Sequence, residues 1–224
     1  MFTLNTLLPL LAAAAASPLG ATPDLAPRQS GSIAVTPHDR YSSSTGVLGC
    51  KIDVNRVAYW PLAPSCDTPC VKVTSADSGR AVHLLHIDQS GGAYDISYDA
   101  WNYLATGASA LEAPAAGGQT AARWEYAGIE ACADVLNGTA LALPFAAASP
   151  GWLAGCAEGS WARQNYELYN IYDPVCRYGY DEKCDWTPGQ GDPVCPHTLG
   201  AQPVLDAAGV WNIDYPTGEL SLAM

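Results

Sequence analysis

The sequence predicts a mainly β, disulfide-rich fold with a few short helices. Three observations lead to this fold class. Two β-branched runs flank a tight turn between residues 71 and 87, eight cysteines follow an apolar leader, and stretches with helical periodicity are short. The unit between residues 66 and 104 has the clearest pattern, so we expect the rest of the domain to be organised around it.

The first residues have the pattern of a secretory leader. An apolar run from about Leu7 to Ala16 is too short to span a bilayer, and small residues follow it before Pro18. We therefore predict a signal peptide at residues 1–16, with cleavage between positions 16 and 21. The protein is expected to be secreted and extracellular or associated with a cell wall.

The segment after the leader divides into two parts before the domain begins. Residues 17–28 are a candidate propeptide that ends at Arg28, a candidate single-basic processing site. Residues 29–46 are rich in Ser, Thr, Gly and Pro and are predicted to be a flexible segment that leads into the domain. Residues 47–224 are then expected to form one disulfide-linked domain, because their length suits a single core.

The cysteines predict a disulfide framework rather than a metal site. Their number is even in an exported chain, and three precede residue 71 while five follow residue 131. If all of them pair within the chain, at least one bridge must join the two groups. The predicted disulfide cysteines are Cys50, Cys66, Cys70, Cys132, Cys156, Cys176, Cys184 and Cys195.

The net charge of -12 excludes several classes of partner. Such a charge repels nucleic acid and anionic membrane surfaces, and no apolar run beyond the leader approaches the ~20 residues of a membrane helix. We expect a monomer without a nucleic-acid or membrane role. No cofactor and no metal are predicted, because the His, Cys and acidic residues lack the spacing of zinc or EF-hand sites.

The first part of the domain reads as strands and turns. Residues 47–60 favour a first strand or a pair of short strands, and residues 61–69 favour a loop. Residues 71–74 predict a strand, residues 75–79 a turn, and residues 80–87 a second strand. Alternation along this second strand predicts that four side chains share one face, with Asp88 at the end of the strand: Val82, Leu84, His86 and Asp88.

A short helix is predicted after this hairpin. Ser97 stands at the N-cap position, Asp99 lies in the first turn, and Gly107 follows the last turn. Trp101 and Leu104 are three residues apart, so they should face the core.

The remainder of the chain predicts one strand, two helices and a final strand. Residues 120–129 alternate as a strand, and a helix is expected to start near residues 149–151, where Ser precedes Pro. A second helix is predicted over residues 160–172, and residues 210–216 favour the last strand. Asn137 begins an Asn-Gly-Thr sequon and is a candidate glycosylation site.

The order of these motifs resembles a known fold. Val-x-Val-Thr, a turn, an apolar strand ending in Asp, a glycine-rich loop, Asp-Ile-Ser, a short helix and a Trp-bearing strand are similar to the second half of a double-psi β-barrel. This barwin-like fold is shared by expansins, fungal expansin-like proteins, rare lipoprotein A-like domains and barrel-type endoglucanases. The resemblance covers residues 47–128. It implies a barrel core at about 47–131 and a cysteine-rich extension at 132–224.

The resemblance also implies site residues. Asp88 and Asp95 match the two family aspartates, with Asp95 at the position of the general acid. The segment at residues 57–66 resembles the Tyr-Trp-Asp segment of the endoglucanases, but Pro61 stands where that family has its catalytic base. Asp53 or Asp67 would have to replace the base in a hydrolase. The layout from residue 49 to 179 is further similar to secreted fungal proteins treated as wall or effector proteins.

Each candidate has a structural alternative. Asp95 could cap the helix that follows Ser97, and Asp88 could hold a loop by accepting backbone N–H groups. Four aromatic residues near the expected groove could stack on sugar rings or belong to the core: Tyr59, Trp60, Tyr94 and Tyr98.

Three functions are consistent with these residues. The leading hypothesis is a secreted, non-hydrolytic protein that binds cell-wall polysaccharide or a host target, because Pro61 cannot accept a proton. The first alternative is a small polysaccharide-cleaving enzyme, of endoglucanase or lytic type, that uses Asp95 as general acid. The second is a cysteine-proteinase inhibitor, an activity known among barwin-like proteins.

Overall fold

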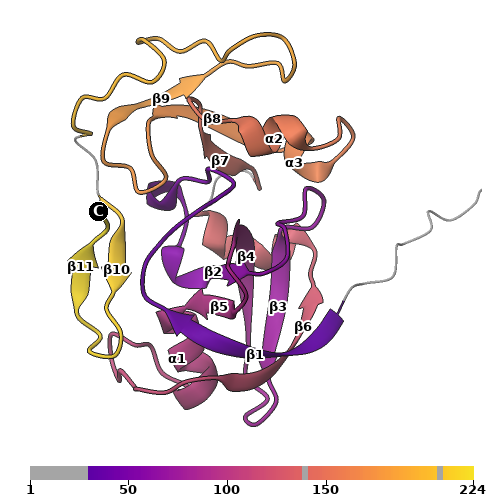
Figure 1. The fold of residues 1–224 in the computed structure, drawn as a ribbon, viewed down its shortest axis with the longest axis vertical. Helices are drawn as coiled ribbons and strands as arrows, with labels where there is room; N and C mark the ends of the chain where they lie inside the picture. Colours follow the sequence, from indigo (N-terminus) through magenta and orange to yellow (C-terminus); the bar gives the residue numbers. More distant parts are fainter. Residues whose placement is uncertain (1–29, 138–140, 206–208) are drawn as a thin grey trace, which may run out of the picture.

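The computed structural model describes residues 30–137, 141–205 and 209–224, and the predicted signal peptide and candidate propeptide lie outside these ranges. The described chain is mainly β (Figure 1). It contains a closed six-stranded barrel, a three-stranded sheet and a two-stranded hairpin. Within the described ranges, no helix has the length and apolar character needed to cross a membrane.

The barrel contains both parallel and antiparallel neighbours. Its strand order is β1-β5-β2-β4-β3-β6, with parallel pairing between β1 and β5 and between β2 and β4. The other pairs are antiparallel. The strands are β1 (Ser30–His38), β2 (Val57–Trp60), β3 (Cys70–Ser75), β4 (Ala81–Gln89), β5 (Tyr94–Ser97) and β6 (Thr120–Tyr126).

The prediction of a flexible segment at residues 29–46 is wrong for residues 30–38. These residues form β1, which closes the barrel by pairing with β5 on one edge and β6 on the other. Val35 is fully buried in the barrel core. The strand is held by partners about 60 to 90 positions later in the chain, so its Ser- and Gly-rich composition did not reveal it. The barrel therefore begins at residue 30, not at residue 47.

The hairpin and the helix that follow confirm most of their predictions. β3 and β4 pair across a turn, and α1 (Tyr98–Thr106) ends at Gly107, whose φ of 91° is left-handed. Trp101 and Leu104 are buried. Ser97 stands at the N-cap position as predicted, but its side chain makes no capping hydrogen bond to α1. Its Oγ donates to the carbonyl oxygen of Val54 at 2.7 Å and so ties β5 to the segment before β2.

Residues 47–60 are less extended than predicted. Two 3₁₀ helices, η1 (Gly49–Lys51) and η2 (Val54–Arg56), precede β2, so only the second of the two expected short strands forms. The Asp53 side chain caps η2 by accepting the backbone N–H of Asn55 at 3.0 Å.

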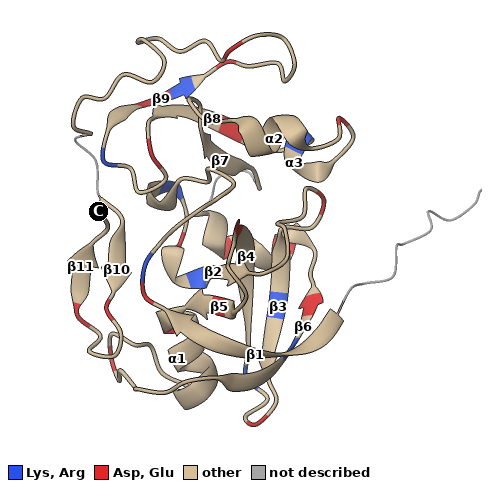
Figure 2. Cartoon of the chain, in the orientation of Figure 1, with Lys and Arg blue, Asp and Glu red and all other residues tan. Residues whose placement is uncertain are grey.

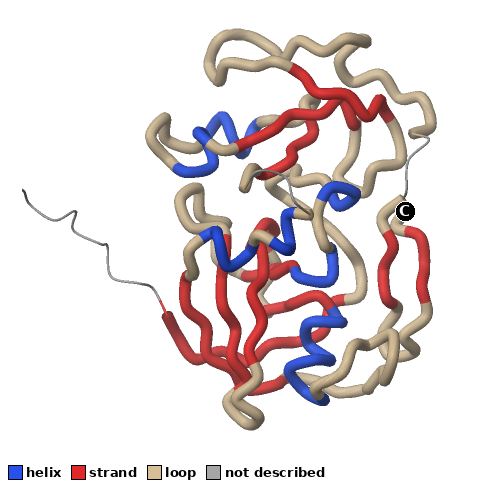
Figure 3. Tube along the Cα trace, turned by 180° about the vertical axis from the view of Figure 1, so that it is seen from behind, coloured by secondary structure: helices blue, strands red, loops and turns tan. Residues whose placement is uncertain are grey.

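The extension forms a small sheet and a hairpin. The sheet has the order β7-β8-β9, and the hairpin of β10 and β11 runs beside the barrel (Figures 1 and 3). The elements are η3 (Ile129–Cys132), η4 (Asp134–Leu136), β7 (Leu143–Ala146), α2 (Gly151–Gly155), α3 (Trp161–Gln164), β8 (Tyr166–Ile171), β9 (Gly179–Cys184), β10 (Trp211–Ile213) and β11 (Leu220–Leu222).

The predicted helix over residues 160–172 is wrong beyond Gln164. Residues 166–171 form β8, which pairs in parallel with β7 and antiparallel with β9. Trp161, Leu168 and Tyr172 are spaced so that they would lie close to one face of a helix, which suggested that element. In the structure, Tyr172 is 43% exposed while Leu168 is buried. Pairing on both edges therefore outweighed the local periodicity.

Four disulfides are present among the described residues, and three of them join the early and late cysteines as counting required. The pairs are Cys50–Cys176, Cys66–Cys156, Cys70–Cys132 and Cys184–Cys195. Such a framework is consistent with an extracellular protein.

Two hydrophobic clusters make up the core. One fills the barrel and includes Val73, Leu84, Trp60 and residues of α1. The other lies between the outer face of the barrel and the extension, and it includes Tyr59, Ile87 and Phe145. In β4, Leu84 and Ile87 therefore face different clusters, as predicted. The prediction that Asp88 shares the face of His86 is wrong, because a register shift pairs His86 with Ala58 but Asp88 with Tyr59, on the other face.

Candidate functional site

The outer face of β1, β5 and β2 carries a polar strip made of Thr36, His38, Asp95 and Tyr59. Thr36 and Tyr59 are the strand partners of Asp95 on its two sides. His38 follows Thr36 by two positions, so both side chains lie on the same face. The intervening residues of these strands face the barrel core. We refer to these four residues as the Asp95 strip.

Asp95 is held by a strand neighbour. The Thr36 hydroxyl donates a hydrogen bond to Asp95 Oδ1, and the carboxylate is half-buried. The described contacts of Asp95 include none to the N-terminus of α1, so the alternative that it caps this helix is wrong. The carboxylate instead lies in the middle of the strip, between the strand partners Thr36 and Tyr59.

Asp88 has a structural place beside this strip. The register of β2 and β4 shifts between Ala58 and Tyr59, so that Asp88 pairs with Tyr59. Its carboxylate accepts from the backbone N–H of Ser44 at 2.9 Å, from its own neighbour Gln89 at 2.8 Å, and from the Ser42 hydroxyl. The alternative that Asp88 holds a loop through backbone N–H groups is therefore confirmed.

His38 was not predicted to belong to the site. Its ring lies against Tyr59 with centroids 4.5 Å apart and planes tilted by 49°. Burial raises the pKa of Tyr59 well above its usual value, and the nearby Asp88 charge adds to this effect. Tyr59 is therefore a neutral hydroxyl in the physiological range. Recognising residues 30–38 as a strand would have been the signal needed to find His38.

The four predicted aromatic residues do not form an open wall. Trp60 is fully buried inside the barrel, where its ring lies 5.5 Å from Tyr94 and 5.1 Å from Trp124. Tyr98 is 2% exposed, and its hydroxyl donates to the carbonyl oxygen of Ala115 at 2.9 Å. Tyr59 is also buried, and only Tyr94 is half-buried. Most of these rings are core, as the structural alternative expected.

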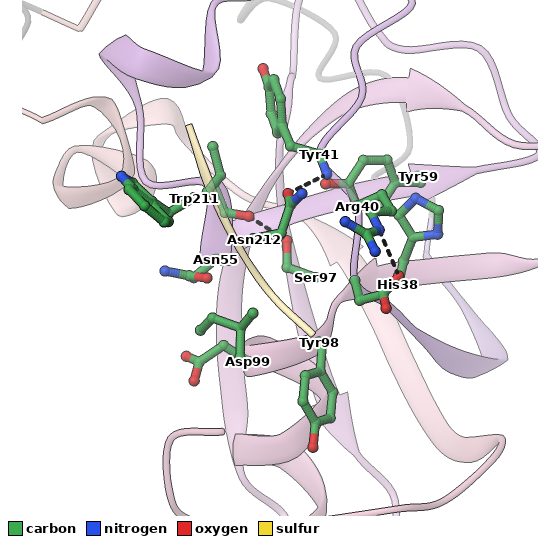
Figure 4. Close-up of a pocket in the computed structure, with 13 residues that line it drawn as sticks. His38, Arg40, Tyr41, Asn55, Tyr59, Ser97, Tyr98, Asp99, Trp211 and Asn212 are labelled. Atoms are coloured by element: carbon green, nitrogen blue, oxygen red, sulfur yellow. Dashed lines mark hydrogen bonds and ion pairs between the residues drawn. The ribbon is translucent and has the colours of Figure 1, made fainter. Parts of the chain in front are cut away.

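A shallow hollow adjoins the Asp95 strip at the junction of the barrel and the β10–β11 hairpin (Figure 4). We call it the Trp211 hollow. It leaves only about 10 Å³ for the centre of a water molecule, which is room for about one water. Residues from five segments line it: His38, Asp39, Arg40, Tyr41, Val54, Asn55, Tyr59, Ser97, Tyr98, Asp99, Trp211, Asn212 and Ile213.

Trp211 is the exposed aromatic of this region. It is 51% exposed, although its neighbour Asn212 is buried. The backbone N–H of Tyr41 donates to Asn212 Oδ1 at 3.0 Å, which fixes β10 to the segment after β1. Figure 4 shows Trp211 and Asn55 at one side of the hollow and His38 and Arg40 at the other. The arrangement is a flat apolar ring beside hydrogen-bonding side chains.

Asp99, one of the residues that line the hollow, belongs to a charged pair. Arg56 Nη1 donates to Asp99 Oδ2 at 2.7 Å, and the Asp99 carboxylate is 7% exposed. Burial alone would raise the pKa of Asp99, but hydrogen bonds from Ser109, Arg56 and the Ala110 N–H more than offset this, and the pKa is lowered. The pair therefore stays ionised and fixes α1 against η2.

Two other predicted features have a clear location. Asn137 is exposed at the end of η4, while Gly138 and Thr139 of its sequon lie outside the described residues. Among the residues that the structure describes, no group of three or more His, Cys, Asp or Glu side chains could hold a metal ion.

In comparisons with known proteins, neither a family model nor a curated protein matches the chain.

Proposed function

We propose that this protein is an extracellular polysaccharide-binding protein with a double-psi type of barrel, which acts without hydrolysis. The observation that carries the proposal is the half-exposed Trp211 ring, which lines the same hollow as His38, Arg40 and Asn55. Flat aromatic faces pack against the apolar faces of sugar rings, while neighbouring polar groups bind the hydroxyls. The hollow is too small to enclose a sugar ring, so a polymer would contact the exposed Trp211 ring from the surface.

The mixed parallel and antiparallel barrel supports the double-psi part of the proposal. The resemblance described above relates Asp88 and Asp95 to the two aspartates of that fold, and both lie at the same end of the barrel sheet, next to Tyr59. The disulfides support an extracellular location. A wall polysaccharide is therefore the ligand class that we favour over a host protein.

Non-hydrolytic action is supported by the hydrogen bonds of the carboxylates that could replace the missing base. The resemblance puts Pro61 at the position of the base, and Asp53 is used in capping η2. Asp67 accepts the backbone N–H of Trp161 at 3.1 Å. Each candidate replacement for the base is thus already occupied in holding the fold.

One observation favours a second candidate, the cleaving enzyme. Asp88 and Asp95 are on opposite sides of Tyr59 in neighbouring strands, which puts their backbones about 10 Å apart because strands are spaced by about 4.8 Å. Inverting glycosidases use carboxyl groups about 6.5 to 9.5 Å apart. The Asp88 carboxylate oxygens already accept hydrogen bonds that hold the loop, so this candidate ranks second.

Two assays test the proposal. In sedimentation with insoluble chitin, β-glucan and cellulose, the protein should be found in the pellet with at least one of them. Its absence from all three pellets would remove the polysaccharide assignment. In parallel, soluble fragments released from each polymer are measured, and we expect none. Release that is lost in Asp95→Asn would establish the enzyme in place of the binding protein.

A further inference from the structure

A second polar surface lies on the outer face of β1, β6 and β3, away from the Trp211 hollow. Strand pairing places Ser32, Arg123 and Thr74 in one row across the three strands. The next row on the same face contains Ser30, Glu125 and Lys72. Figure 2 shows the blue segments of β3 and β6 that correspond to these cations. The surface is hollowed to a volume of about 450 Å³.

Arg123 differs from the other cations of the described chain. Each of the other described Lys and Arg side chains forms an ion pair or donates to a carbonyl oxygen, including Lys72, which lies 3.4 Å from Glu125. The Arg123 guanidinium has no such partner among the described residues, although it is exposed in a chain of net charge -12. It is a cation with free hydrogen-bonding capacity.

Further groups around Arg123 are also free. The hydroxyls of Ser30, Ser32 and Thr74 have no hydrogen-bond partner among the described residues. The same is true of Trp124 Nε1, which is not sealed from solvent and lies 3.0 Å from the position that a Cβ would take at Gly31. The glycine therefore leaves the indole N–H open to the hollow. The surface offers an unpaired guanidinium, three hydroxyls and an indole donor.

These groups define the chemistry of a ligand. Guanidinium groups bind carboxylates through two parallel hydrogen bonds, and hydroxyls pair with the hydroxyls of a sugar. The hollow has the volume of a small-molecule site. Its lining offers hydroxyls beside the guanidinium. We propose that this surface binds a carboxylate-bearing sugar, a uronic acid residue, with the carboxylate on Arg123.

The negative net charge of the protein favours a short ligand over a long one. A long polyuronate would be repelled by the other acidic groups of the protein, whereas a short oligomer brings few charges. A short oligouronide should therefore bind better than the polymer at low salt, and the difference should shrink as salt rises. This site does not depend on the polysaccharide function proposed for the Trp211 hollow, because the two use different faces and different residues.

Calorimetric titration with trigalacturonate tests the inference, with its fully methyl-esterified form as the neutral probe. The folded wild-type protein should bind the acid and not the ester. Arg123→Gln should weaken binding about 10-fold or more, and Thr74→Val about 3-fold, because each removes hydrogen bonds to the ligand. Arg177→Gln removes one charge from the extension instead and should change binding less than 2-fold.

The outcomes separate this site from its alternatives. Absence of binding by trigalacturonate, or equal binding to Arg123→Gln, overturns the proposal. Equally strong binding of triglutamate would assign the surface to acidic peptides and overturn the sugar assignment. Circular dichroism and thermal unfolding show whether each variant is folded. Because Trp211→Ala leaves this face intact, loss of trigalacturonate binding in that variant would also contradict the assignment.

Discussion

Trp60 lies against His86 inside the barrel, with ring centroids 5.0 Å apart. The His86 side chain is 1% exposed, and neither of its ring nitrogens reaches a hydrogen-bond partner; the same holds for Trp60 Nε1. Burial lowers the pKa of His86 to about 4. The nearby backbone groups of Asp88 and Leu62 act to raise this pKa, but their effect is smaller than that of burial. The barrel core thus contains a neutral imidazole that resists protonation.

This arrangement predicts a loss of stability in mild acid. The unfolded chain binds the proton near pH 6.5, whereas the folded protein binds it near pH 4. The contribution is therefore present above pH 6.5 and declines as the pH falls towards 4, by about 3 kcal/mol in total. Denaturant unfolding between pH 4 and 7 measures it. His86→Phe should have a flatter profile than the wild type, and an unchanged slope in this variant would contradict the role of the buried imidazole.

The Arg56–Asp99 pair predicts a cost for removing the cation. Arg56→Met leaves the buried Asp99 carboxylate without its counter-charge, and we expect a loss of about 2 kcal/mol in the free energy of unfolding. The Arg56 side chain is 29% exposed, so the loss stays below that of a fully buried pair. Lys72→Met, in a more exposed pair, should cost less than about 1 kcal/mol. Equal losses in the two variants would argue against a structural role for Asp99.

The disulfides predict unequal effects of removal. Cys66 and Cys156 are 90 positions apart, whereas Cys184 and Cys195 are 11 apart. Closing the longer loop restricts the unfolded chain more, so replacing Cys66 and Cys156 with Ala should cost about 4 kcal/mol, and replacing the other pair less than about 3. Thermal unfolding of the two double variants checks this order. A larger loss for the Cys184–Cys195 pair would contradict it.

Local patterns in the sequence predicted the central unit well. The β3–β4 hairpin and the end of α1 at Gly107 depend on turn residues and alternation that short segments encode. Asp88 lies near the end of its strand as predicted, and the alternative to its predicted catalytic role, that it holds a loop, is confirmed. Its position beside Tyr59, however, depends on a register shift between two strands. Sequence alternation alone cannot show such a bulge.

The errors concern residues whose state is set by distant partners. β1 exists because β5 and β6 bind its two edges, and β8 exists because β7 and β9 do. The errors in the predicted site have the same cause. His38 was missed because its strand was missed, and Trp211 was read only as part of a last strand because nothing local shows that its ring stays exposed. Trp60 was chosen for its chemistry, yet the barrel closes around it.

The central claim is that the Trp211 hollow binds wall polysaccharide, and replacing its exposed ring tests this most directly. The fraction of Trp211→Ala bound to the retained polymer is measured against wild type and against Tyr172→Ala, which removes an aromatic ring that is 43% exposed on the extension. Loss of one stacking ring should weaken binding about 10-fold. We predict that Trp211→Ala loses binding while Tyr172→Ala retains it. Equal binding by all three proteins would contradict the account.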